Sequence, residues 1–120
     1  MARVLMLEDS DALATAIIVA LEEDGHSVML FRSVRQARHA IPPIGFDVLL
    51  CDYELPDGTG LDFLREVGSL DRWTTILWSG LDRLREVSDS GVAVDHVLLK
   101  DDPALVFAIV AEAQTPWMSA

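Results

Sequence analysis

Five residues whose side chains could do chemistry stand where short apolar runs end. Glu8 and Asp9 follow VLML, Asp52 follows FDVLLC, Ser79 follows TTILW and Lys100 follows HVLL. A charged group at the end of a buried strand is costly unless something pairs with it. The pattern therefore predicts that these side chains meet, provided that the apolar runs are neighbouring strands of one sheet.

Three carboxylates, one hydroxyl and one ammonium at a single edge suit a divalent cation and a phosphoryl group. Crowded carboxylates repel one another, and at least one pKa rises unless a cation lies among them. Oxygen ligands, few in number, favour Mg²⁺, which keeps several waters. Lys100 could neutralise one phosphoryl oxygen and Ser79 could hydrogen-bond another, while Gly80 lets a backbone amide approach closely. These side chains suit phosphoryl transfer, in which the protein chiefly positions the reacting groups and neutralises their charge.

The elements that must position these residues alternate along the chain as strand, then helix. Short strands that are apolar on both faces are typical of a parallel sheet covered by helices. The pattern predicts an α/β fold, a doubly wound five-stranded parallel sheet of order 2-1-3-4-5, flavodoxin-like, with sites at the carboxyl ends of the strands. The predicted strands are 4–7, 27–31, 46–51, 74–78 and 96–99.

The helices are delimited by capping and breaking residues. The first predicted helix runs from Ser10 and Asp11 up to Gly25, and the second from the Ser33–Gln36 capping box to Pro42 and Pro43. The third covers 61–67 and ends at Gly68 and Ser69, and the fourth covers 82–90 and ends at Gly91. The last covers 103–114, with Asp102 as N-cap and Pro103 at the first helical position.

Length, composition and net charge limit the classes of protein that are consistent with this sequence. With 120 residues and 51% hydrophobic residues, one compact domain is expected over 1–120, with a core over about 2–114 and a short tail over 115–120. A net charge of −11 argues against nucleic-acid binding. No apolar stretch suits a membrane span or a secretory signal, so we expect a cytoplasmic protein. Lys100 is the only lysine among nine basic residues, which suggests a role for its compact ammonium.

At these residues the sequence resembles the receiver domain of two-component response regulators, the CheY-like superfamily. The resemblance rests on Glu8-Asp9, on Asp52 with the downstream LPDGTG, on Ser79-Gly80 and on Lys100. All four elements occur in order, each at a strand end, and together they cover nearly the whole chain.

The resemblance implies that Asp52 accepts a phosphoryl group from a histidine of a sensor kinase or a phosphotransfer protein, in a Mg²⁺-dependent reaction of a phosphorelay. The domain would signal through a conformational change to a downstream protein or output domain, and it would be no enzyme beyond its own phosphorylation and dephosphorylation. The implied roles are metal binding by Glu8, Asp9, Asp52 and the backbone carbonyl of Glu54, and phosphoryl chemistry by Asp52, Ser79, Gly80 and Lys100.

Two positions depart from the family pattern. Val97 stands where the family has Tyr or Phe, and Asp101 stands where it has proline after the lysine. The alternative is therefore an interaction module that keeps the receiver fold and works without phosphorylation. A phosphatase of the haloacid dehalogenase type is disfavoured, because Glu54 occupies the place of its second aspartate. The kinase, the target, the acyl-phosphate lifetime, homodimerisation and membership of a larger protein stay open.

Three residues outside this set carry simpler expectations. His26 lacks a carboxylate or cysteine partner at ligand spacing and is predicted to be a surface residue. Asp57 is predicted to be a turn residue that hydrogen-bonds its own backbone. Cys51 lies inside an apolar strand and is predicted to be a small buried hydrophobe.

Overall fold

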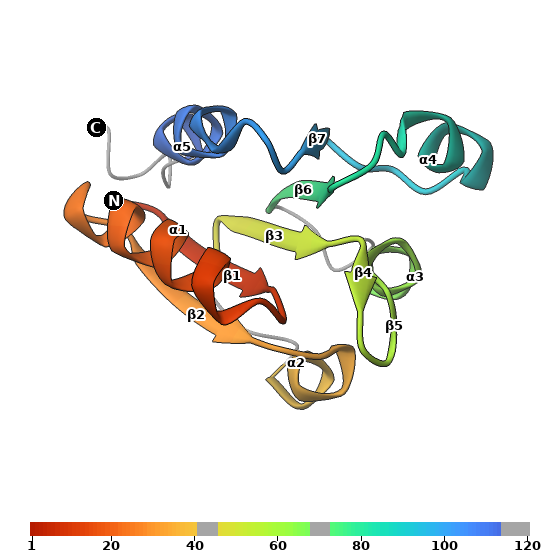
Figure 1. Ribbon diagram of the computed structural model, residues 1–120, viewed down its shortest axis with the longest axis horizontal. Helices are drawn as coiled ribbons and strands as arrows, with labels where there is room; N and C mark the ends of the chain where they lie inside the picture. The colour runs from red at the N-terminus through yellow and green to blue at the C-terminus, as the bar shows by residue number, and fades with distance from the viewer. Residues whose placement is uncertain (41–45, 68–72, 114–120) are drawn as a thin grey trace.

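The computed structural model describes residues 1–40, 46–67 and 73–113. Its main element is a five-stranded sheet in the order β2-β1-β3-β6-β7, with all neighbouring strands parallel (Figure 1). These five are the first to fifth strands of the sequence prediction, so the predicted order 2-1-3-4-5 is confirmed. The strands are β1 Arg3–Leu7, β2 Ser27–Phe31, β3 Val48–Asp52, β6 Thr74–Ser79 and β7 His96–Leu99.

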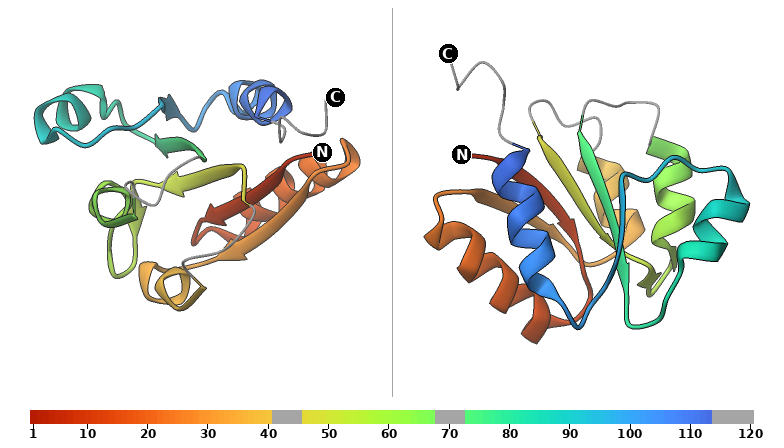
Figure 2. Two further views of the ribbon diagram at one scale, coloured as in Figure 1. Left: turned by 180° about the vertical axis from the view of Figure 1, so that it is seen from behind. Right: turned by 90° about the horizontal axis from the view of Figure 1, so that it is seen from above.

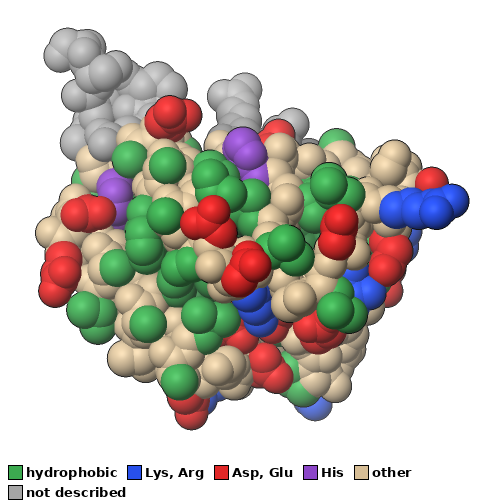
Figure 3. Space-filling view, turned by 45° about the horizontal axis from the view of Figure 1, so that its top comes forward, with side chains coloured by type: hydrophobic (Ala, Val, Ile, Leu, Met, Phe, Trp, Pro, Cys, Tyr) green, Lys and Arg blue, Asp and Glu red, His purple; other side chains and the backbone are tan. Residues whose placement is uncertain are grey.

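Helices cover both faces of this sheet, as the apolar strands predict. α1 (Asp11–Glu23) and α5 (Pro103–Glu112) lie on one face, and α2 (Val34–Ala40), α3 (Gly60–Val67) and α4 (Leu84–Ser90) lie on the other (Figures 1 and 2). Figure 3 shows Asp and Glu side chains spread over the side of the molecule that carries α5 and β7. None of the helices in the described ranges is both long and apolar enough to cross a membrane.

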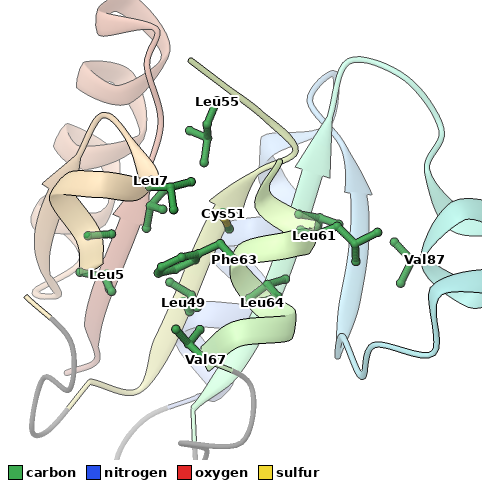
Figure 4. Packing of buried hydrophobic residues seen from close by; sticks show 13 residues of the cluster. Leu5, Leu7, Leu49, Cys51, Leu55, Leu61, Phe63, Leu64, Val67 and Val87 are labelled. Carbon is green, nitrogen blue, oxygen red and sulfur yellow. The ribbon is translucent and has the colours of Figure 1, made fainter. Parts of the chain in front are cut away.

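The alternation of side chains along each strand divides the core into two layers. Every residue of β3 is buried, as expected for the central strand. The layer under α2, α3 and α4 is built on Leu5, Leu7, Leu49, Cys51 and Leu77, and Figure 4 shows several of these beneath Phe63 and Leu64. The layer under α1 and α5 is built on Val4, Met6, Val48, Leu50, Ile76 and Trp78.

The helix starts follow the predicted caps with small differences. The Ser10 hydroxyl accepts a hydrogen bond from the Leu13 amide at 3.4 Å, and the Ser33 hydroxyl accepts one from the Gln36 amide at 3.1 Å. The Gln36 side chain, however, accepts from the Arg32 amide at 2.9 Å, so the capping box is displaced by one residue on its return side. The predicted stops at 42–43, 68–69 and 114 lie outside the described residues.

Several predicted bounds of strands and helices differ from the observed ones by one or two residues. β3 ends at Asp52 instead of at Cys51. α4 begins at Leu84 instead of at residue 82, because the Asp82 carboxylate accepts from the Leu84 amide at 2.9 Å.

The loop after β3 contains a small antiparallel hairpin, β4 (Glu54–Leu55) with β5 (Gly58–Thr59), where only a turn was expected. At its tip Asp57 accepts hydrogen bonds from the Val34 and Arg35 amides, each at 2.9 Å. The prediction of a local turn bond therefore missed the main role of Asp57, which is to cap the start of α2 from a loop that is distant in the sequence.

The prediction that His26 is a surface residue is wrong. His26 is 8% exposed, and its Nδ1 atom accepts a hydrogen bond from the Ala2 amide at 2.9 Å. The partner of His26 is a backbone amide just before β1, and the spacing of side chains in the sequence could not indicate such a partner. The expectation for Cys51 is confirmed, because its side chain is fully buried and burial raises the pKa of the thiol.

Gly60 allows α3 to start directly against the end of β3. Its amide donates to the Tyr53 carbonyl at 2.8 Å. A Cβ atom at this position would overlap the Asp52 carbonyl oxygen and would lie 2.8 Å from the Cys51 sulfur. The absence of a side chain therefore fixes how closely α3 approaches the strand that carries Asp52.

We predict that Gly60→Ala lowers the free energy of unfolding by about 3 kcal/mol, because backbone atoms must move to make room. Gly80→Ala is the matched control, since a Cβ there would meet nothing within 4 Å. Urea unfolding followed by circular dichroism measures both. Equal stability of the two variants would contradict the close approach.

Candidate functional site

The hydrogen-bond ladder of the sheet continues beyond the strand ends and places the predicted residues at one edge. The Glu8 amide donates to the Phe31 carbonyl at 3.0 Å, and the Lys100 amide donates to the Ser79 carbonyl at 2.9 Å. Asp52 is paired in register with Trp78, the residue before Ser79. The backbone itself therefore brings together residues that are remote in the sequence.

Glu8, Asp9 and Asp52 form an acidic cluster at this edge. Glu8 and Asp52 are each only 1% exposed, while Asp9 is exposed. One carboxylate oxygen from each of the three lies within 4.8 Å of the others. Two of these carboxylates are thus nearly removed from water, where an unpaired charge is most costly.

Lys100 supplies the compensating charge. Its ammonium lies 3.0 Å from Glu8 Oε1 and 2.9 Å from Asp52 Oδ2, and its side chain is 21% exposed. Burial lowers the pKa of Lys100, but hydrogen bonds and attraction from Asp52 and Glu8 outweigh this, so the pKa is raised and the ammonium stays charged.

Asp52 keeps an unusually basic carboxylate despite this partner. Burial raises its pKa from 3.8 to about 6, and the charge of Glu8 also raises it. The hydrogen bonds from Lys100 and from the Glu54 amide, the latter at 3.1 Å, act in the opposite direction. Desolvation is the largest effect, and together with the charge of Glu8 it outweighs the effect of Lys100 and of the Glu54 amide.

The acidic cluster fits a divalent cation. Three carboxylates and one ammonium leave a formal charge of −2, which a divalent ion would neutralise. All available donors are oxygens, the set that Mg²⁺ prefers. Glu8 Oε1 is buried, and the partner that the described residues give it is the Lys100 ammonium at 3.0 Å. Glu8, Asp9 and Asp52 are therefore the side chains able to hold such an ion, and the predicted role of the Glu54 carbonyl stays a prediction.

Ser79 lies at the same edge, but its hydroxyl is engaged elsewhere. Its Oγ atom donates to Glu54 Oε1 at 3.0 Å and accepts from the Leu81 amide at 3.1 Å. Gly80 is exposed and borders open space, so its backbone is accessible as expected. The cluster thus unites Glu8, Asp9, Asp52 and Lys100, whereas the Ser79 hydroxyl is held by Glu54.

Arg83 contacts Ser79 and Glu54 and is in turn held by Glu86 and Tyr53, and the sequence prediction gave none of these three residues, Arg83, Glu86 and Tyr53, a role in the site. Arg83 pairs with Glu54 Oε1 at 2.6 Å and with Glu86 Oε1 at 2.8 Å. The Tyr53 hydroxyl donates to Glu86 Oε2 at 2.5 Å. The hydrogen bond from Arg83 lowers the pKa of Glu54. A signal existed in the spacing, since Arg83 and Glu86 are three residues apart at a helix start, but nothing in it indicated Glu54 as a partner.

The comparison with known families decides the affiliation. The model of the response regulator receiver domain matches residues 4–87. The chain belongs to this family. The matched range of this receiver domain includes Glu8, Asp9, Asp52 and Ser79, whereas Lys100 and the two departures at Val97 and Asp101 lie beyond it.

Relatives and solved structures agree with this affiliation. The receiver domain is 36% identical over 76 residues to the transcriptional regulatory protein TrcR of Mycobacterium tuberculosis, covering 63% of this chain and 30% of that protein. It is 33% identical over 99 residues to KdpE of Escherichia coli, the KDP operon transcriptional regulatory protein, covering 79% of this chain and 41% of that protein. The chain therefore spans well under half the length of these relatives.

Solved receiver domains share the whole architecture. The CheY-like response regulator receiver domain of Methanospirillum hungatei superposes with a TM-score of 0.82 at 23% identity, covering 93% of this chain and 92% of that one. The response regulator TrrA of Thermotoga maritima, solved in complex with Mg(2+)-BeF, gives 0.81 at 19% identity, covering 95% and 100%. At this identity the likeness establishes the fold.

We predict that Asp52→Asn stabilises the protein at pH 7.5 in a chelator by about 1 to 3 kcal/mol. The folded state binds a proton at Asp52 that the unfolded chain releases, so ionisation of Asp52 costs folding free energy as pH rises from about 4 through 6. The gain should be clearly smaller at pH 4.5 and should vanish only below the unfolded-state pKa of 3.8. Urea unfolding at both pH values measures it.

The exposed Asp89→Asn serves as the control for this substitution. It should leave the free energy of unfolding nearly unchanged at either pH. A stabilisation by Asp52→Asn that is equal at pH 4.5 and pH 7.5 would contradict the assignment of a raised pKa.

Proposed function

We propose that this receiver domain takes a phosphoryl group onto Asp52 from a phosphohistidine of a sensor kinase or phosphotransfer protein, in a Mg²⁺-dependent reaction. One observation carries the proposal: the buried Asp52 carboxylate lies 2.9 Å from the Lys100 ammonium and within 4.8 Å of oxygens from Glu8 and Asp9. The nucleophile, a fixed cation and a set of metal-binding oxygens are thus adjacent.

The transfer exchanges a P–N bond for a P–O bond. An Asp52 carboxylate oxygen attacks the phosphorus, and the P–N electron pair leaves with the imidazole, which takes up a proton. The product is an aspartyl acyl phosphate. Asp52 is suited to attack because burial and the neighbouring charge of Glu8 raise its pKa, which makes its carboxylate more basic than that of an exposed aspartate.

Lys100 and Ser79 would act on the incoming group by charge and hydrogen bonding. The raised pKa of Lys100 keeps its ammonium available for a phosphoryl oxygen. Ser79, at the end of the adjacent strand, has the hydroxyl that could donate to another oxygen, and the Gly80 backbone is exposed beside it. Such contacts neutralise charge that is spread over the phosphoryl oxygens during transfer.

Mg²⁺ would be held by Glu8, Asp9 and Asp52, with the Glu54 carbonyl as a further ligand, and would neutralise charge on the phosphoryl oxygens. The formal charge of −2 on the acidic cluster with Lys100 supports a divalent ion. The Mg(2+)-BeF complex of TrrA supports the same chemistry by analogy. We extend it to this chain as part of the proposal.

The segment would work as a single receiver unit inside a two-component pathway. TrcR and KdpE are transcriptional regulatory proteins, and this chain corresponds to 30% and 41% of their lengths. We propose that the phosphoryl state of Asp52 is passed on to a downstream protein or output domain. The domain's own chemistry would be limited to gaining and losing the phosphoryl group.

We predict that Mg²⁺ with acetyl phosphate adds one phosphate to the intact protein. Asp52→Asn should abolish the addition, and removal of Mg²⁺ with a chelator should prevent it. Mass spectrometry of the intact protein measures the added mass. Asp62→Asn, at an exposed position of α3, is the matched control and should behave like wild type.

Undiminished addition after Asp52→Asn would contradict the proposal. If acetyl phosphate adds nothing to the wild type, phosphorylated kinases and phosphotransfer proteins are tested as donors, and failure of all of them would reject it. The departures at Val97 and Asp101 favour the alternative, an interaction module without phosphorylation. Equal partner affinity of phosphorylated and unphosphorylated protein would support that alternative.

A further inference from the structure

The Ser79 hydroxyl has no spare proton for a phosphoryl group. A serine hydroxyl has one hydrogen to donate and two lone pairs to accept with. Its hydrogen bonds to Glu54 at 3.0 Å, and its oxygen accepts from the Leu81 amide at 3.1 Å and from Arg83 Nε at 3.4 Å. A hydrogen bond from Ser79 to a phosphoryl oxygen on Asp52 therefore requires that the bond to Glu54 break.

Arg83 holds Glu54 in the position that captures this hydroxyl. The guanidinium lies 2.6 Å from the same Glu54 oxygen, Oε1, that accepts from Ser79. Only 18% of the Arg83 side chain is exposed, and its guanidinium stacks 4.1 Å from the centre of the Tyr53 ring. An arginine held by ion pairs and an aromatic face has little freedom to reorient.

The other side of the guanidinium is tied to α4. Arg83 Nη1 pairs with Glu86 Oε1 at 2.8 Å, and Glu86 Oε2 accepts from the Tyr53 hydroxyl at 2.5 Å. The Arg83 carbonyl accepts the first hydrogen bond of α4, from the Val87 amide at 3.0 Å. One residue thus joins the loop after Asp52, the end of β6 and the first turn of α4.

We infer that Arg83 is a positioning residue that holds the Ser79 hydroxyl on Glu54 in the unphosphorylated protein and couples its release to the start of α4. The inference rests on the proposed function. When a phosphoryl oxygen on Asp52 accepts the hydrogen bond of the Ser79 hydroxyl, the charge of the phosphoryl group also repels Glu54. The ion pair of Glu54 with Arg83 is then drawn out of place, and the first turn of α4 moves with it.

The displaced turn borders a surface groove. Leu84 lies directly after Arg83 and is 58% exposed. Arg83 and Leu84 line a groove of about 250 Å³ together with Val97, Leu99 and Leu105 from β7 and α5. A change at Arg83 would therefore alter the shape of a groove that none of the three carboxylates of the acidic cluster lines.

The test measures how the first turn of α4 responds when Asp52 is phosphorylated, and whether that response requires Arg83. Amide resonances of Leu84 and Val87 are recorded in ¹⁵N-labelled protein with Mg²⁺, before and after a donor that phosphorylates the wild type, and intact mass gives the phosphate added. Wild type should show shifts at both amides. Arg83→Gln should lose most of these shifts in molecules that carry phosphate. Arg85→Gln, an exposed arginine of the same helix, should keep them.

Two more variants separate coupling from a folding defect. Arg83→Lys keeps a charge for Glu54 but cannot hold Glu54 and Glu86 as a fork, so it should restore part of the shifts. Glu86→Gln leaves Arg83 and Glu54 in place but weakens the link to α4, so it should reduce the shifts.

Full shifts in phosphorylated Arg83→Gln would overturn the inference while leaving the proposed function intact. Absence of phosphate on the wild type with every donor would reject the proposed function, and this inference with it.

Discussion

The contact of one ammonium with two buried carboxylates is the interaction on which the site depends. Lys100 lies 3.0 Å from Glu8 and 2.9 Å from Asp52, and both carboxylates are almost fully buried. Removing the ammonium would leave both buried carboxylates without their cation, and an unpaired buried charge typically costs about 3 to 5 kcal/mol. The contact also links the residue that follows β7 to the ends of β1 and β3, so it joins three strand ends at the site.

Charge in this region is divided between two groups with different balances. The acidic cluster with Lys100 is formally negative, and burial together with the charge of Glu8 raises the pKa of Asp52. The group around Arg83 is compact, and its hydrogen bond to Glu54 lowers the pKa of that carboxylate. The first group has a formal charge that a divalent cation would neutralise, whereas the second holds Ser79 through hydrogen bonds between side chains. Binding and signalling would thus draw on neighbouring but distinct sets of side chains.

Much of this arrangement could be predicted because strand ends are marked in the sequence by a change from apolar to charged residues. Asp52 and Lys100 each close an apolar run, and parallel strands bring such residues to one edge. The contacts of Arg83 could not be predicted, because they depend on where α4 starts and on the side-chain orientation of Glu54 in a loop. The hydrogen bond that His26 accepts from the Ala2 amide could not be predicted either, because the two residues are distant in the sequence. Local patterns indicate elements and their ends, whereas pairings between loops require coordinates.

Calorimetric titration of Mg²⁺ into the metal-free protein tests most directly whether the acidic cluster is a cation site balanced by Lys100. The account predicts one binding site in the wild type, its loss in Asp52→Asn, and tighter binding in Lys100→Met because the competing ammonium is gone. Each variant is first checked for folding by circular dichroism. Equal Mg²⁺ affinity in all three folded proteins, or weaker binding in Lys100→Met, would contradict it.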